Sequence, residues 1–95
     1  RLAAVEPEPP YHWFALGQQA LRRGDARTAR DLFAREVARA QYSSEFHYWL
    51  AVAHFQLGET SAAQRHLEHA QALSTSRDER DLYAAKLAWL NQHQH

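Results

Sequence analysis

Apolar residues recur three and four positions apart in five successive segments of this chain, residues 11–23, 26–40, 45–57, 60–73 and 78–91. In the first segment they are Trp13, Leu16, Gly17, Ala20 and Leu21, and in the second Ala29, Leu32, Phe33, Val37 and Ala40. This spacing places the apolar side chains on one face of a helix. The pattern therefore predicts an all-α chain of five amphipathic helices.

The polar segments between the predicted helices contain residues that commonly start a helix. Asp25 is suited to cap the second helix, a serine of the Tyr42-Ser43-Ser44 segment the third, and Thr60 the fourth. Ser76 and Glu79 have the spacing of a capping box, in which each side chain satisfies a backbone donor at the helix start. These caps predict where the helices begin.

A shift of 34 residues relates the first two predicted helices to the next two. Gly24 and Gly58 lie 34 residues apart and each is followed by an acid. Each glycine can adopt the left-handed backbone that commonly ends a helix. The same register aligns three further identical pairs, Leu16/Leu50, Ala29/Ala63 and Ala38/Ala72. A helical pair this short cannot bury its own apolar face, so the repeat predicts pairs stacked against each other.

The residues in this register resemble the tetratricopeptide repeat (TPR), a helix-turn-helix unit of about 34 residues. The first unit matches its signature at Trp13, Leu16, Gly17, Ala29 and Phe33, and the second more loosely at Leu50, Ala51, Ala63 and Leu67. The chain departs from the pattern where the family places a tyrosine (Ala20 and His54) and a closing proline (Gln41 and Thr75).

The resemblance implies a right-handed TPR-type solenoid of five helices. It divides the chain into repeat 1 at residues 11–43, repeat 2 at residues 44–77 and a capping helix at residues 78–91. The proline-rich residues 1–10 are expected to form a linker, and residues 92–95 a polar tail. The chain begins with Arg1 rather than methionine, so we expect it to be a piece of a larger protein.

In this family the first helix of each pair lines a concave groove, and the resemblance implies the same here. The residues carried onto that surface are Tyr11, Phe14, Gln18, Arg22, Glu45, Tyr48, Val52, Gln56, Leu82, Lys86 and Trp89. Such an aromatic and mildly polar surface suits an extended peptide or an amphipathic helix. Some family members clamp a terminal carboxylate, but Phe14 and Gln18 stand where that motif would begin, so a clamp is not expected.

Three functions follow from these patterns. The first is a module that binds a partner protein or peptide in its groove. The second is self-association or stacking on further repeats. The third is nucleic-acid binding by arginines of the second helix, but Asp31 and Glu36 lie at ion-pairing distance from them along the helix. We therefore expect a protein partner and no nucleic acid.

Length, charge and composition limit the class of protein. Ninety-five residues suffice for one small domain, and the zero formal net charge gives no electrostatic signature for nucleic acid or membrane. No apolar run approaches the roughly 20 residues that span a bilayer, so no membrane insertion is expected. The absence of cysteine excludes disulfides and thiolate ligands. The sequence does not indicate the cellular compartment.

Catalytic and cofactor sites are not predicted. The chain has no glycine-rich phosphate loop, and its serines between helices are explained by capping. Among the seven histidines, His66 and His69 share a helix face with a spacing that can ligate zinc. A third converging ligand is not evident from the sequence. The sequence therefore predicts no enzyme, no cofactor and no metal site.

Overall fold

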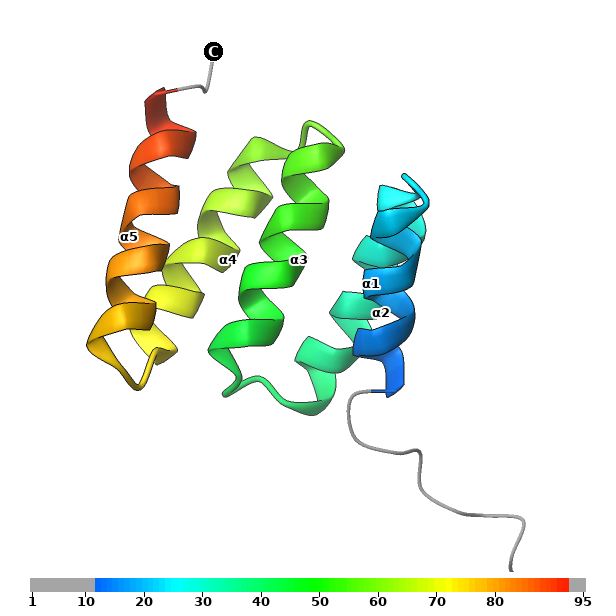
Figure 1. Ribbon diagram of the computed structural model, residues 1–95, viewed down its shortest axis with the longest axis horizontal. Coiled ribbons are helices and arrows are strands. Elements are labelled where there is room, and N and C mark those ends of the chain that lie inside the picture. Colours follow the sequence, from blue (N-terminus) through cyan, green and yellow to red (C-terminus); the bar gives the residue numbers. More distant parts are fainter. Residues whose placement is uncertain (1–11, 93–95) are drawn as a thin grey trace, which may run out of the picture.

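The computed structural model describes residues 12–92, which form five helices joined by short turns (Figure 1). The helices are α1 (His12–Arg22), α2 (Ala26–Arg39), α3 (Ser44–Gln56), α4 (Thr60–Leu73) and α5 (Arg77–Gln92). Each helix packs against the next one along the chain, so the array is a helical repeat solenoid. The predicted all-α fold with five helices is confirmed. The predicted linker at residues 1–10 lies outside the described residues.

The turns within the two helical pairs have the geometry that the glycines predicted. Gly24 and Gly58 have φ angles of 82° and 78°, which residues with a side chain rarely adopt. The N-caps of α2 and α3 are also as predicted. The Asp25 carboxylate accepts a hydrogen bond from the Thr28 amide at 3.2 Å, and Ser43 Oγ accepts one from the Phe46 amide at 3.2 Å. Local sequence therefore sets these boundaries.

Two helix starts differ from the prediction. Thr60 is the first residue of α4, and Glu59 occupies the N-cap position without a side-chain capping bond. Its carboxylate instead contacts His54 and Arg30, at 2.7 and 3.0 Å. At α5, Ser76 Oγ accepts the Glu79 amide at 3.1 Å, but the Glu79 carboxylate accepts the Thr75 amide rather than that of Ser76. Glu59 thus makes tertiary contacts instead of a cap, whereas α5 keeps its serine cap and lacks only the reciprocal bond of the capping box.

The close approach of α1 and α2 depends on Gly17 and Phe33. Phe33 is fully buried, and a β-carbon added to Gly17 would lie only 2.5 Å from its ring. The second repeat has Ala51 and Leu67 at these positions, both buried. The pairing of a small residue with a large one across the two helices explains these TPR-like positions.

A buried acid joins α2 to the start of α1. Glu36 is 1% exposed, and its Oε2 accepts a hydrogen bond from the Phe14 amide at 2.9 Å. Its other oxygen lies 3.6 Å from the Arg39 guanidinium. The carboxylate thus satisfies a donor of the first turn of α1, where the helix itself offers no acceptor. The sequence indicated only the pairing with Arg39.

Among the five described helices, none is long and apolar enough to cross a membrane.

Candidate functional site

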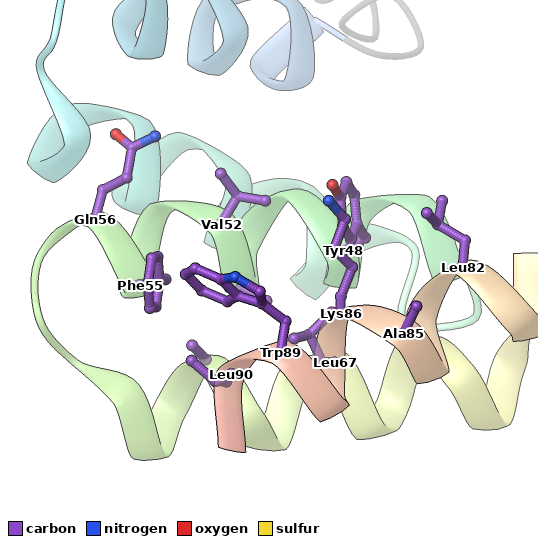
Figure 2. A pocket seen from close by; sticks show the side chains of 12 residues that line it. Tyr48, Val52, Phe55, Gln56, Leu67, Leu82, Ala85, Lys86, Trp89 and Leu90 are labelled. Atoms are coloured by element: carbon purple, nitrogen blue, oxygen red, sulfur yellow. The ribbon is translucent and has the colours of Figure 1, made fainter. Parts of the chain in front are cut away.

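An apolar groove of about 600 Å³ lies between α3 and α5, with α4 as its floor (Figure 2). Its lining comes from three helices and consists of Tyr48, Ala51, Val52, Phe55, Gln56, Ala63, Leu67, Leu82, Ala85, Lys86, Trp89 and Leu90. Three of these residues are alanines, and large apolar side chains make up most of the rest. The groove is therefore an apolar surface that three helices contribute.

Large side chains fix the two walls of the groove. Phe55 of α3 and Trp89 of α5 meet edge to face with ring centroids 5.1 Å apart. Nearer the other end, Tyr48 faces the buried Tyr83 at 5.4 Å. Leu90 is 2% exposed and packs with the α4 residues beneath. These contacts hold α3 and α5 at a defined separation, so the groove is built into the fold.

The rim of the groove is apolar with few polar groups. Leu82 and Trp89 remain 47% and 46% exposed, and both line the same groove. Lys86, the only lysine of the chain, extends from α5 toward α3 in Figure 2. Gln56 lies at the end of α3. The site thus offers apolar contact area, one cation and one amide.

The structure brings together six of the eleven residues expected on the groove surface. Those that line it are Tyr48, Val52, Gln56, Leu82, Lys86 and Trp89. Phe14 is 8% exposed and packs against Phe33 and Phe46, so it contributes to the core instead. Gln18, Arg22 and Glu45 lie outside this groove, and Tyr11 lies outside the described residues. The site is therefore restricted to the second helical pair and α5.

Sequence reasoning did not place Phe55, Leu90 and the residues of the floor in the groove. The floor includes Ala63 and Leu67 of α4, the second helix of its pair. The resemblance assigns the surface to first helices only, so it could not indicate them. The apolar stripe of α5 carries a signal for Leu90, because it lies one helical turn from Lys86.

A comparison with protein-family models bears on this architecture. The tetratricopeptide repeat model matches residues 10–35 and 44–69, which together exceed half of the chain. The chain belongs to the tetratricopeptide repeat family. Neither the comparison with curated proteins nor the one with solved structures found a significant match. TPR units are generally protein–protein interaction modules.

A cluster of histidines occupies another face of the second TPR unit. The buried His47 of α3 meets His66 and His69 of α4, and one ring nitrogen from each of the three lies within 4.8 Å of the others. His47 Nδ1 lies 3.2 Å from His66 Nδ1. The third imidazole that the sequence did not indicate is therefore His47, which stands where the family places a tryptophan.

Burial favours the neutral form of His47 and His66. Burial, together with the smaller effects of the nearby His47, His54, His69 and Arg65, lowers the pKa of His66 to about 4. Burial also lowers the pKa of His47. A fourth ring, His54, stacks on His66 with centroids 5.4 Å apart, and its Nδ1 contacts Glu59. Hydrogen bonding to His54 and to Arg30 lowers the pKa of the Glu59 carboxyl group.

The arginines of α2 make contacts within the TPR array. Arg30 pairs with Asp31 at 3.2 Å and with Glu59 at 3.0 Å. The Arg35 guanidinium lies 4.6 Å from the ring centroid of Trp13. These are not the pairs that the helical spacing predicted; of those, the structure shows Arg39 with Glu36 at 3.6 Å.

Proposed function

We propose that this TPR protein binds an amphipathic helix of a partner protein in the groove between α3 and α5. The observation that carries the proposal is the open apolar groove with Leu82 and Trp89 about half exposed at its rim. Exposed apolar side chains gathered around a depression are typical of sites that another molecule covers. The general role of TPR units as protein-interaction modules supports a protein as the occupant.

The length of the groove favours a helical segment. Tyr48 and Gln56 mark its extent along α3, and eight residues of helix span about 12 Å. An occupying helix with apolar residues at positions i, i+4 and i+7 presents a stripe of about 10 Å. Two turns of such a helix therefore match the groove.

Lys86 favours a partner helix that carries a negative charge. Among residues 12–92 it is the only cation that lines the groove, and it lies beside the exposed apolar rim. A carboxylate next to the apolar stripe of the partner helix would pair with it as the helix inserts. Such a rim pair contributes mainly to specificity and association rate rather than to affinity.

The proposal can be tested with a display library of helical peptides selected on the wild-type protein. We expect enrichment of sequences with three apolar residues at helical spacing and an adjacent acid. Selected peptides are then measured by fluorescence anisotropy against Leu82→Glu, in which a charge enters the groove from an exposed position. The matched control is Tyr42→Glu, because Tyr42 is 77% exposed and lies outside the groove.

We expect Leu82→Glu to weaken peptide binding by about 10- to 100-fold, since burial of a leucine stabilises a complex by roughly 1.5–3 kcal/mol. Tyr42→Glu should bind as the wild type does. Peptides that bind all three proteins equally would refute the groove as the site. Sedimentation over a concentration series addresses the alternative. A dimer that Leu82→Glu abolishes would assign the groove to self-association instead.

A further inference from the structure

We propose that His47, His66 and His69 bind a divalent transition-metal ion, such as Zn²⁺, with solvent as the fourth ligand. The three residues come from both helices of the second TPR unit, and their ligand atoms converge within 4.8 Å. Neutral imidazole is a common ligand for zinc, copper and nickel, whereas Mg²⁺ and Ca²⁺ prefer oxygen. The ligand set therefore selects the class of ion.

The contact between His47 and His66 has the spacing of two ligands on one ion. Zinc binds imidazole nitrogen at about 2.0–2.1 Å in tetrahedral geometry, which places two such nitrogens roughly 3.3 Å apart. The two Nδ1 atoms lie 3.2 Å apart. Their separation therefore fits two ligands of one ion, which would replace the hydrogen bond between the two rings and the proton in it.

The proton of His47 is already on the other nitrogen. His47 Nε2 lies 3.0 Å from the Gln41 carbonyl oxygen, which can only accept a hydrogen bond. The Nε2–H therefore donates to this carbonyl, and the lone pair of Nδ1 faces His66. A backbone carbonyl that orients a metal-binding histidine through its second nitrogen is the usual outer-shell arrangement.

His69 supplies the third ligand from an exposed position on α4. Its ring meets His47 edge to face at 5.2 Å and His66 at 5.9 Å. Because the side chain is exposed, it can rotate by the roughly 1.5 Å that separates the present spacing from a tetrahedral one. The same exposure leaves the fourth position accessible to water. Three protein ligands plus solvent is the composition of an open zinc site.

The neighbouring His54 lies outside this ligand set. It stacks on His66, but its Nδ1 is directed to the Glu59 carboxylate at 2.7 Å. The ion would therefore join α3 to α4 through three imidazoles. It would cross-link the two helices that form one wall and the floor of the groove, from another face of the pair.

The test uses the full chain carrying His93→Gln and His95→Gln, which removes competing histidines near the C-terminus. Isothermal titration with Zn²⁺ measures affinity and stoichiometry, and the visible absorption of added Co²⁺ reports the geometry. The ligand variants are His69→Gln and His66→Gln. His12→Gln is the matched control, because His12 lies on α1 outside the cluster. Circular dichroism checks that each variant remains helical, and the exposed His69 is the variant least coupled to folding.

We expect one ion per chain and a four-coordinate Co²⁺ spectrum. The affinity should fall in both ligand variants by more than the roughly 10- to 100-fold that loss of an outer-shell partner costs. His12→Gln should bind as the background protein does. The proposal is overturned if folded His69→Gln and His66→Gln keep the background affinity, if Co²⁺ is six-coordinate, or if the ion binds only between two chains.

Discussion

Substitution of Gly17 by alanine tests whether the first TPR unit is held by close packing of α1 on α2. The added β-carbon would lie 2.5, 2.7 and 3.0 Å from three atoms of the Phe33 ring. Ordinary carbon contacts are about 3.5–4.0 Å, so the ring or the helix must move by roughly 1 Å. Phe33 has no exposed surface into which it can retreat. The substitution therefore overpacks a closed core.

The magnitude follows from two opposing effects. Overpacking of a closed core costs about 1–3 kcal/mol, and replacing glycine with alanine inside a helix recovers about 1 kcal/mol of helix propensity. We expect the upper part of the first range because three ring atoms are affected, so Gly17→Ala should lower the free energy of unfolding by about 1–2 kcal/mol. For a domain of this size that corresponds to a fall in melting temperature of roughly 4–15 °C.

The second repeat shows the compensation to use in a double-mutant cycle. It pairs Ala51 with Leu67, where the first pairs Gly17 with Phe33. Phe33→Leu alone should be destabilising because it leaves a cavity. In the double variant the cavity accommodates the new methyl group, so the two effects should fall short of additivity by at least about 1 kcal/mol. Urea denaturation followed by circular dichroism measures all four proteins. Additive effects within about 0.5 kcal/mol, or a more stable Gly17→Ala, would refute the packing argument.

Two further predictions concern buried polar groups. Glu36→Ala removes the acceptor of the Phe14 amide and should lower the free energy of unfolding, measured by urea denaturation, by about 2–3 kcal/mol. Glu36→Gln keeps a carbonyl oxygen at this position and should lower it clearly less. Equal losses of stability in the two variants would contradict the hydrogen bond as the cause. The second prediction concerns pH and is measured with a metal chelator present. The pKa of His66 is lowered to about 4 in the folded protein. The unfolded chain therefore binds more protons than the folded protein between about pH 6.5 and 4. Stability should be fully present above about pH 6.5 and fall as the pH drops toward 4, by about 2 kcal/mol rather than the full shift because solvent screens the half-buried ring. The fall should be smaller in His66→Gln, and parallel pH profiles of the two proteins would argue against this account. The titratable and charged side chains near His66 are His47, His54, His69 and Arg65.

The groove was predictable only in part. The resemblance to the tetratricopeptide repeat, carried over in register, implied that Tyr48, Val52 and Trp89 share one surface, and these side chains line the same groove. It also assigned Phe14 to that surface, whereas the ring packs into the core beside Phe33. Register gives the direction of a side chain around its own helix. It does not give the distance to the neighbouring helix, which decides whether the side chain is covered.

The sequence by itself determined the five helices, the two glycine turns and the 34-residue register, because these depend on interactions between residues close along the chain. Helical periodicity, the left-handed backbone of Gly24 and the Asp25 cap each act over a few residues. Only the tertiary structure decided that Glu36 accepts the Phe14 amide and that His47 meets the histidines of α4. Those contacts depend on how far each helix is rotated and translated against its neighbour. That placement results from packing over the whole array, and no local pattern encodes it.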